Sequence, residues 1–335
     1  MNKEQSKEAL LEVRDLHTHF FTKAGVVKAV DGVDITIPAG KTVGLVGESG
    51  CGKSMTAMSI MGLIANPGKI VQGEILFHGK NLLELNRKEY RKLCGNRLSI
   101  IFQEPMTSLN PVETVGKQVS EAMFIHEHIS KEQAKERVLK LFTEVGIPDP
   151  QRRYYNYPHQ LSGGLRQRIM IAMAMACKPD LLIADEPTTA LDVTIEAQII
   201  HLMKKLQREN GTSILMITHN LGVVAEICDY VYVMYAGQVV ECADVYELFK
   251  HPMHPYTKGL LQSLPKMQSG QGRLYNIKGM VPDLLKLPDG CRFAPRCDYA
   301  CSKCHESIPA LTDLGNGHLI RCCMNNHQVT EGGKL

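Results

Sequence analysis

GESGCGKS, residues 47–54, stands between the apolar stretch TVGLV (42–46) and the stretch MTAMSIMGLI (55–64). This peptide fits the pattern G-x-x-x-x-G-K-[S/T], with a predicted strand before it and a predicted helix after it. Its glycines allow the backbone to turn amide groups inward at the start of a helix, which makes an anion-binding loop. The stretch therefore predicts an α/β nucleotide-binding fold built around a phosphate loop.

Each residue of the phosphate loop is a candidate ligand of ATP. We expect Lys53 to reach the β- and γ-phosphates and the Ser54 hydroxyl to bind Mg²⁺. A glycine-rich turn with a chance lysine would not account for the whole peptide in its strand–loop–helix context. ATP and Mg²⁺ are thus the expected cofactors, and the predicted nucleotide-binding residues of the loop are Gly47, Glu48, Ser49, Gly50, Cys51, Gly52, Lys53, Ser54 and Met55.

A pair of carboxylates follows a second apolar strand, in LLIADEP (181–187). We expect Asp185 to hold Mg²⁺ through water and Glu186 to polarise the attacking water as a general base. For a lone Asp-Glu pair, the alternative is an acidic strand end that only caps a turn. The phosphate loop upstream favours the catalytic interpretation.

The composition predicts a globular chain with one large core, or with one core and a smaller appendage, since 44% of its 335 residues are hydrophobic. The formal net charge is +3 and both signs are spread along the chain, so we expect no nucleic-acid partner. The charged start MNKEQSKEAL lacks the apolar stretch of a secretory signal. The longest apolar run, 169–177, is shorter than the about 20 residues that cross a membrane. These features predict a cytoplasmic protein, unless a partner holds it at a membrane.

Strand and helix patterns alternate through the first 245 residues, as in an α/β domain with a largely parallel sheet. Helical periodicity dominates between Asn86 and Tyr157. We therefore expect an ATPase domain over 1–248 with a helical subdomain inserted at about 86–165, and then a small irregular, cysteine-rich extension over 249–335. Predicted strands are Leu11–Val13, Thr42–Val46, Ser99–Phe102, Leu181–Ala184, Ile214–Thr218 and Tyr230–Tyr235, and predicted helices in the insertion are Thr114–Ile125 and Lys131–Val145.

LSGGLRQR, residues 161–168, narrows the class of nucleotide-binding protein. Ser162 can cap the following helix, and Gly163 and Gly164 allow the backbone to approach a phosphate closely. Lying between the phosphate loop and the carboxylate pair, this peptide resembles the signature of ATP-binding-cassette (ABC) ATPases. Three further motifs resemble those of the family: a Q-loop with Gln103 in IFQEP, a D-loop at Leu191–Asp192, and a switch histidine, His219 in ITHN.

The resemblance covers roughly residues 10–245 and implies the P-loop fold of an ABC nucleotide-binding domain. It also implies a nucleotide site shared by two protomers. One protomer would contribute the catalytic residues Glu186, His219 and Gln103, and would hold Mg²⁺ through Ser54, Gln103 and Asp185. The other would close over the γ-phosphate with Ser162 and Gly164. The family stacks an aromatic ring on adenine, and here that ring is Phe20 or its neighbour Phe21.

Six of the eleven cysteines lie between Cys291 and Cys323. Such clustering in a chain without an export signal indicates metal ligation rather than disulfides. The spacings x5, x6 and x17 from Cys291 through Cys297 and Cys304 to Cys322 match neither zinc-ribbon nor ferredoxin patterns. Zinc, an iron–sulfur cluster and free thiols therefore all remain open from spacing alone.

The stretches HPMHPYTKGLLQSLP (251–265) and GCRFAPRC (290–297) resemble the C-terminal segment of oligopeptide/dipeptide importer ATPases. The resemblance implies a [4Fe–4S] cluster held by Cys291, Cys297, Cys304 and Cys322. This chain departs from the pattern by adding Cys301 and Cys323. The pair Cys301-x-x-Cys304 makes zinc an alternative, and the last ligand is either Cys322 or Cys323.

The resemblance thus implies the motor subunit of a peptide importer at the cytoplasmic face of the cell membrane. Its partners would be a second, homologous ATPase in a heterodimer, two integral permease subunits and, indirectly, an extracellular substrate-binding protein. Related importers carry nickel, heme or glycans, so another solute is an alternative. A non-transport ABC ATPase acting on DNA or ribosomes fits less well, because Lys53 and Ser162 are only 109 residues apart, with no coiled-coil heptads between them. A factor for iron–sulfur cluster assembly is a third interpretation of the cysteines.

Overall fold

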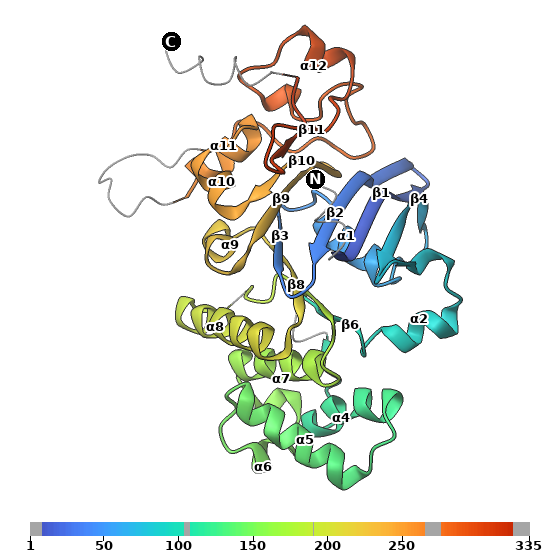
Figure 1. Ribbon diagram of the computed structural model, residues 1–335, viewed down its shortest axis with the longest axis vertical. Coiled ribbons are helices and arrows are strands. Elements are labelled where there is room, and N and C mark those ends of the chain that lie inside the picture. The colour runs from blue at the N-terminus through green and yellow to red at the C-terminus, as the bar shows by residue number, and fades with distance from the viewer. Residues whose placement is uncertain (1–8, 104–107, 190, 265–275, 324–335) are drawn as a thin grey trace. The chain divides into compact units, whose positions relative to one another are not determined.

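The computed structural model describes residues 9–103, 108–189, 191–264 and 276–323 (Figure 1). They form two compact units. Among these described residues, unit 1 comprises those in the ranges 9–36, 42–81 and 218–323, and unit 2 comprises those in the ranges 37–41 and 82–217. The phosphate loop and His219 lie in unit 1, whereas Gln103, the carboxylate pair and the signature peptide lie in unit 2.

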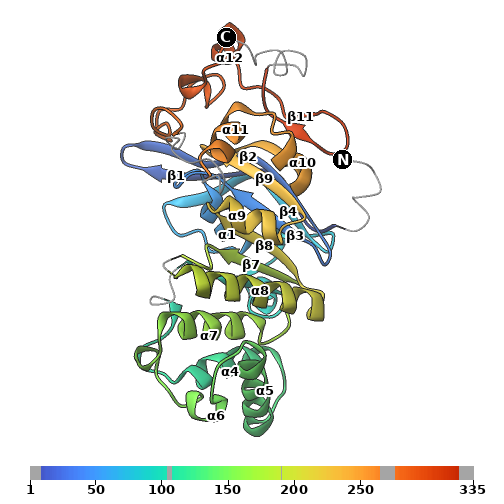
Figure 2. The same ribbon diagram turned by 90° about the vertical axis from the view of Figure 1, so that its left-hand side faces the viewer.

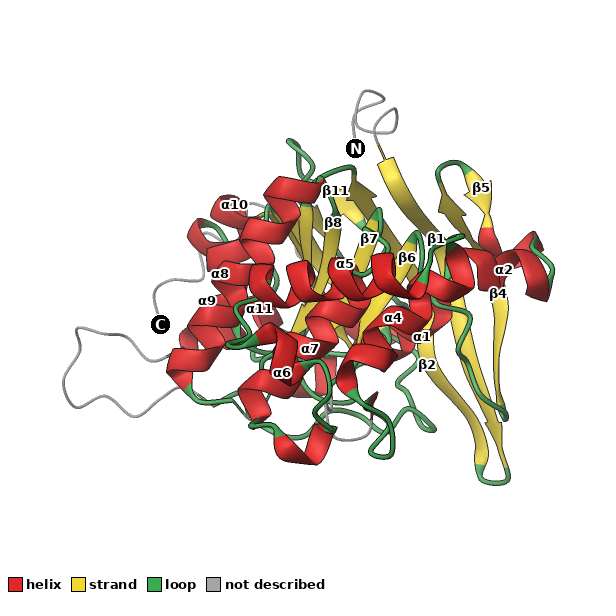
Figure 3. Cartoon of the chain, turned by 90° about the horizontal axis from the view of Figure 1, so that it is seen from below, coloured by secondary structure: helices red, strands yellow, loops and turns green. Residues whose placement is uncertain are grey.

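Unit 1 contains an antiparallel sheet of long strands, drawn side by side in Figure 3. Its strand order is β2-β1-β4-β5, with β1 (Ala9–Thr22), β2 (Gly25–Pro38), β4 (Gly68–Phe77) and β5 (Lys80–Asn81). β1 pairs with β4 from Leu11 opposite Phe77 to Phe20 opposite Gly68. The strand predicted at Leu11–Val13 is therefore confirmed but is much longer than its apolar start indicated.

A second group of strands in unit 1 leads into the phosphate loop. β3 (Thr42–Val46) runs parallel to β9 (Tyr230–Tyr235), and β9 pairs antiparallel with β10 (Gln238–Asp244). Every residue of β3 is buried, as expected for a parallel strand that reads as one apolar run. The helix predicted after the loop is present as α1 (Lys53–Ile60). Helix α9 (Leu221–Ile227) packs against β3.

The residues after β10 add further structure to unit 1. They form α10 (Val245–Lys250), α11 (Pro255–Gln262), the 3₁₀ helix η4 (Ala294–Arg296), α12 (Ser302–Glu306), β11 (Thr312–Asp313) and β12 (Leu319–Ile320). β12 pairs with β10, with Ile320 opposite Glu241. The buried guanidinium of Arg292 donates to the Asp31 carboxylate in β2 and to the Ala236 carbonyl. The tail is thus held by strand pairing and a buried ion pair, although a domain boundary at 248 remains a prediction.

Unit 2 contains three parallel strands. A nearly continuous apolar sequence predicted each of them. β6 (Leu98–Ile101) pairs with β7 (Leu181–Asp185), and β7 pairs with β8 (Ser213–Thr218). The described side chains of β7 and β8 are all buried. Because β7 ends at Asp185, the carboxylate pair stands at the carboxyl edge of these strands, where α/β folds place their ligands.

Helices occupy the part of unit 2 in which the sequence predicts an inserted helical subdomain, and its bounds remain a prediction. α4 (Val115–His126) and α5 (Lys131–Glu144) pack against each other and against α7 (Gly163–Met175), beside α6 (Pro150–Arg153), as Figure 2 shows. α2 (Arg87–Leu93) precedes them and α8 (Val193–Asn210) follows. Both predicted helices are confirmed to within one residue at each end. A capping box of Ser130 and Gln133 fixes the start of α5. Within the described ranges, no helix is long and apolar enough to cross a bilayer.

Candidate nucleotide-binding site

The phosphate loop turns between β3 and α1 through glycines, two of which are closely packed. Gly47 and Gly52 have φ angles of +153° and +105°. A Cβ atom on Gly47 would meet the Met234 carbonyl oxygen at 2.2 Å, and one on Gly52 would meet the Ala29 carbonyl oxygen at 2.3 Å. The loop therefore needs glycine both for its backbone angles and for its close packing.

The side chain of Lys53, which was predicted to bind phosphates, lies inside the phosphate loop. Its ammonium donates to the carbonyls of Gly47 at 2.8 Å and Glu48 at 3.0 Å, and the residue is 5% exposed. Cys51 beside it is fully buried, and burial raises the pKa of its thiol. The loop thus holds one cation and a neutral thiol, which is a positive lining for a phosphate ligand.

Glu48 makes contacts that the sequence did not indicate. Its amide donates to the Tyr256 hydroxyl at 2.8 Å. Its carboxylate accepts two hydrogen bonds from the guanidinium of Arg296, which lies in the tail. No sequence motif joins these residues, since more than 200 positions separate Glu48 from either partner. The role predicted for the Glu48 amide in nucleotide binding remains a prediction.

The carboxylate pair lies at the end of β7 in unit 2. Asp185 is 3% exposed, and Glu186 follows it with a φ of +46°. A positive φ at a residue other than glycine costs about 1–3 kcal/mol and persists where function or tertiary contacts require it. The Glu186 amide donates to the Ile217 carbonyl of β8 at 2.9 Å, so the neighbouring strand holds this turn.

Two side chains fix the Glu186 carboxylate. Its Oε2 accepts from Nε2 of Gln103 and from the hydroxyl of Thr189, both at 2.9 Å. The structure thereby brings together two of the three predicted catalytic residues. Thr189 is an additional contact that the sequence analysis missed, although its place three residues after Glu186 suits a turn that folds back on the carboxylate.

The signature peptide begins α7 and presents its first residues at the surface of unit 2. Ser162 is the N-cap, with its hydroxyl accepting from the Leu165 amide at 3.4 Å, and it is exposed together with Gly163. A Cβ on Gly164 would lie 3.1 Å from a methyl group of Ile195 in α8. Asp192 of the predicted D-loop caps α8 through the Ile195 amide at 2.9 Å. Exposure of Ser162 is what a role toward a second protomer requires.

His219 and the candidate adenine-stacking rings belong to unit 1. His219 is exposed and directly follows β8. The ring of Phe20 is half-buried against the backbone of Gly68, and Phe21 is 47% exposed. The phosphate loop and the Gln103–Glu186 pair are in different units, so the roles of all these residues at one nucleotide remain predictions.

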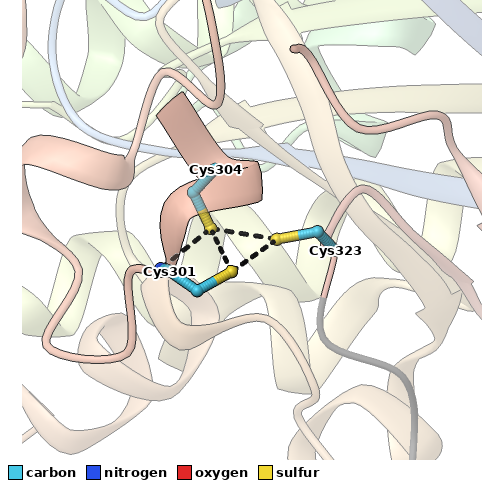
Figure 4. A group of neighbouring side chains, drawn as sticks. All are labelled: Cys301, Cys304 and Cys323. Carbon is cyan, nitrogen blue, oxygen red and sulfur yellow. Dashed lines mark hydrogen bonds between the residues drawn. The ribbon is translucent and has the colours of Figure 1, made fainter. Parts of the chain in front are cut away.

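Three tail cysteines come into contact, and they are not the four that the resemblance implied. The Sγ atoms of Cys301, Cys304 and Cys323 form a triangle, seen in Figure 4, with sides of 3.6 Å from Cys301 to Cys304, 3.8 Å from Cys301 to Cys323 and 2.9 Å from Cys304 to Cys323. Zinc–sulfur bonds of about 2.3 Å in a tetrahedron separate the sulfurs by about 3.8 Å. Two of the three sides therefore fit thiolates that share one metal ion.

The remaining predicted ligands lie around this group. The Cys291 amide donates to the Cys304 carbonyl at 2.7 Å. Burial raises the pKa of Cys297 to about 11, and the thiols of Cys322, Cys291 and Cys304 raise it as well. The four predicted cluster ligands are thus within electrostatic reach of one another. An iron–sulfur cluster on these four residues remains a prediction.

Family models match two parts of the chain. The ABC transporter model matches residues 30–189, and the model of the oligopeptide/dipeptide transporter C-terminal region matches residues 240–304. The second match begins within β10 and includes the first two predicted cluster ligands, Cys291 and Cys297, and Cys304 as its last residue.

Relatives from several bacteria match the chain along nearly all of its length. A probable peptide ABC transporter ATP-binding protein of Sinorhizobium fredii is 51% identical over 98% of this chain and 99% of its own. The oligopeptide transport ATP-binding protein AppD of Bacillus subtilis is 52% identical over 96% of this chain and 98% of its own. The dipeptide transport ATP-binding protein DppD of Escherichia coli is 48% identical over 94% and 96%.

Solved structures match the cassette part of the chain. The dimeric ATP-binding cassette MJ0796, in a post-hydrolysis state with ADP and Pi, matches with a TM-score of 0.64 at 26% identity, over 70% of this chain and 98% of that one. CbiO1 of Clostridium perfringens, part of the complex cbiONQ, matches with a TM-score of 0.62 at 28% identity, over 73% and 92%. Nearly all of each cassette has a counterpart here, whereas part of this chain has none in them.

Proposed function

Because this chain belongs to the family of ATP-binding proteins of peptide ABC transporters, we propose that it is the motor subunit of a membrane importer for di- and oligopeptides. It hydrolyses ATP as an ABC-type ATPase. The observation that carries the proposal is identity of about half the residues along almost the entire length of peptide-transport relatives, the tail included.

The phosphate-binding half of the reaction is assigned to unit 1. The amides of Gly50 through Met55 and the ammonium of Lys53 bind the phosphates, and Lys53 leaves its present carbonyl partners to do so. By the family resemblance, Mg²⁺ would be held by oxygen donors of both units, namely the Ser54 hydroxyl of unit 1 and the Gln103 amide oxygen and Asp185 carboxylate of unit 2. That ion would neutralise the charge that develops on the phosphate oxygens.

The water-activating half is assigned to unit 2. Glu186 accepts a proton from, or polarises, the attacking water, and Gln103 and Thr189 keep its carboxylate in one orientation. His219 and the trans-acting Ser162 and Gly164 complete the site by contacts to the γ-phosphate. The exposed N-cap of α7 supports this assignment, because helix N-termini bind phosphate and this one is not covered by its own protomer.

The proposed partners are a second, homologous ATPase in a heterodimer and two integral permease subunits that hold both at the cytoplasmic face of the membrane. An extracellular binding protein delivers the peptide to the permeases. Large apolar side chains exposed on unit 2 support a protein partner there, namely Val112 at 78%, Phe124 at 45% and Ile125 at 68%. The heterodimer rests on the family resemblance.

The importer assignment is tested with the complete transporter in membranes. Co-expression with the candidate permeases is expected to move this chain into the membrane fraction, and vesicles holding the complex are expected to take up labelled dipeptide only with ATP and the binding protein. A Lys53→Ala complex, assembled to the same extent, is the matched control for uptake without ATP use. A chain that stays in the soluble fraction beside its permeases would overturn the proposal.

For the tail, we propose a [4Fe–4S] cluster on Cys291, Cys297, Cys304 and Cys322, with a zinc ion on Cys301, Cys304 and Cys323 as the alternative. The mutual electrostatic effects of the four thiols, of which that of Cys304 is buried, support the cluster, and the short sulfur separations support zinc. Both occupants need Cys304, so only one of them can be present.

Metal analysis of anaerobically purified protein separates the two occupants. The cluster predicts about four irons for each chain, lost in Cys297→Ser and retained in Cys301→Ser. Zinc predicts one ion for each chain and the reverse behaviour of the two variants. Protein free of both metals in the wild type would reject a metal role for the tail.

A further inference from the structure

Arg296, in the tail, forms an ion pair with Glu48 of the phosphate loop. Its Nη1 donates to Oε2 of Glu48 at 2.7 Å and its Nη2 to Oε1 at 3.1 Å, a bidentate ion pair. The Arg296 side chain is 4% exposed and that of Glu48 is 29% exposed. A two-bond pair with a buried arginine is stronger and better defined in geometry than a surface ion pair.

The guanidinium is itself held in place. Its Nε donates to the Lys278 carbonyl at 2.8 Å and its Nη2 to the Ile277 carbonyl at 3.3 Å. It also lies over the rings of Tyr235 and Phe293, with its central carbon 5.8 Å and 6.0 Å from their centroids. Although burial acts to lower the pKa of Arg296, its hydrogen bonds to Glu48 and Tyr235 outweigh burial and raise that pKa. Arg296 is therefore a charged group with little freedom to move.

A second tail residue holds the backbone at the same point. The Glu48 amide donates to the hydroxyl of Tyr256 at 2.8 Å, and Tyr256 is fully buried. Its ring packs against Tyr235 and Phe293, with centroids 4.7 Å and 5.4 Å away. Side chain and backbone of Glu48 are thus both fixed by residues that follow the cassette strands, on one aromatic support.

The loop has a physical need for this support. Glycine, which loses more conformational freedom on ordering than any other residue, stands at positions 47, 50 and 52 around Glu48, each with positive φ. When a phosphate ligand binds, any part of the loop that is not yet ordered must become ordered. The entropy lost in this ordering makes the binding free energy less favourable. Contacts that order the loop beforehand therefore increase affinity for the nucleotide.

We propose that Arg296 is a positioning residue for ATP binding, which acts by fixing the phosphate loop through Glu48. The proposal rests on the proposed role of this loop in holding the phosphates. It gives the tail a part in the ATPase reaction besides that of holding a metal: residues beyond 250 influence how well the cassette binds its nucleotide.

The test compares Arg296→Gln, Arg296→Lys, Glu48→Gln and the double variant Glu48→Gln/Arg296→Gln in the full chain. Lys278→Gln is the matched control, because it removes an exposed tail ion pair with Asp298 and leaves the Lys278 carbonyl that Arg296 uses. Equilibrium titration with a non-hydrolysable ATP analogue gives Kd, steady-state hydrolysis gives KM and kcat, and thermal unfolding gives Tm.

Arg296→Gln and Glu48→Gln are each expected to raise Kd and KM about tenfold, which corresponds to about 1.4 kcal/mol, with kcat at saturating ATP within about twofold of wild type. The Kd and KM of Arg296→Lys are expected to lie between those of Arg296→Gln and those of wild type, since an ammonium cannot make the bidentate contact of a guanidinium. The double variant is expected to lose no more than either single variant, because all three remove one interaction.

Unchanged Kd and KM in Arg296→Gln, with a lowered Tm, would make the ion pair merely structural and overturn the inference. Additive losses in the double variant would also overturn it. Failure of the proposed function looks different: wild-type protein would bind no ATP, or Lys53→Ala would bind it as well as wild type. If the Lys278→Gln control also binds ATP more weakly than wild type, the effect comes from a general loosening of the tail. That result would count against a positioning role for Arg296.

Discussion

The side-chain amide of Gln103 donates a hydrogen bond of 2.9 Å to the carboxylate of Glu186, and both residues belong to unit 2. Thr189 donates to the same oxygen at the same distance. The carboxylate is thereby oriented within one unit before a nucleotide binds. Since orientation of a general base contributes to kcat rather than to ATP affinity, residues of this group are expected to affect turnover first.

Glu186→Gln is expected to reduce ATP hydrolysis by about a hundredfold or more, the contribution of a positioned general base. The amide keeps the size of the carboxylate and can still accept from Gln103 and Thr189, so ATP affinity and Tm should stay near the wild-type values. Single-turnover hydrolysis and equilibrium ATP binding measure the two effects. Hydrolysis within a few-fold of wild type would remove Glu186 from the reaction.

Thr189→Val is expected to lower kcat several-fold without a change in KM, because valine keeps the shape of threonine and removes the donor to Glu186. Thr188→Val is a neighbouring control, since the Thr188 hydroxyl donates to Glu196 in α8, whereas that of Thr189 donates to Glu186. Steady-state kinetics of both variants give the comparison. An equal loss of kcat in the two would indicate a general effect on this turn.

Ser162→Ala is expected to lose the N-cap of α7 and with it about 1 kcal/mol of unfolding free energy. Ser162→Asp keeps a good cap, and aspartate is favourable at a helix N-terminus. If Ser162 faces the γ-phosphate of a second protomer, Ser162→Asp should nonetheless abolish hydrolysis by repulsion while Tm is retained. Urea unfolding and ATPase assays on both variants test this, and an active Ser162→Asp protein would argue against contact with the phosphate.

His254 is expected to make the protein acid-sensitive. Burial lowers its pKa from 6.5 to about 4, although the charge of Glu241 opposes that shift. Because the folded state holds His254 neutral and the unfolded state protonates it, this contribution to stability is intact above about pH 6.5. It declines as the pH falls toward 4. Nearby His318, whose pKa the Glu241 carboxylate raises against the effect of burial, acts in the opposite sense.

His254→Asn isolates this effect, because asparagine retains an acceptor for the Tyr256 amide at the start of α11. His318 is present in both proteins, so its contribution cancels in the comparison. Urea midpoints between pH 7.5 and 4.5 should decline less steeply in the variant than in wild type. Parallel curves would assign the acid sensitivity to other groups.

Much of the architecture was predictable because it depends on local pattern. The buried strands Thr42–Val46 and Tyr230–Tyr235 are continuous apolar runs, and the helix at 131 begins at a capping box, so each carries its own signal. The tail was harder: β12 is only two residues long and pairs with β10 across nearly 80 positions. Such a strand owes its existence to its partner and leaves no periodicity to detect.

The site divides in the same way. The residue types of the loop, the carboxylates and the signature are set by chemistry at fixed spacing, so roles for Lys53, Glu186 and Ser162 could be predicted from the sequence. The contacts of Thr189, Tyr256 and Arg296 could not be predicted, because they depend on a turn or on residues far apart in the sequence. The sequence predicted Cys304 as a cluster ligand and offered Cys301 and Cys323 as alternatives, but not that these three thiols meet, since folding, not spacing, decides which thiols come into contact.

The grip of Arg296 on Glu48 constrains how such a chain can be recombined. A hybrid that joins this cassette to the tail of a relative would keep the phosphate loop in register only if an arginine returned to the same place beside the Tyr235 and Phe293 rings. Positions 48 and 296, almost 250 residues apart, are therefore expected to change together or not at all. Hybrids whose tails lack a suitable partner for Glu48 are expected to fold but to bind ATP weakly.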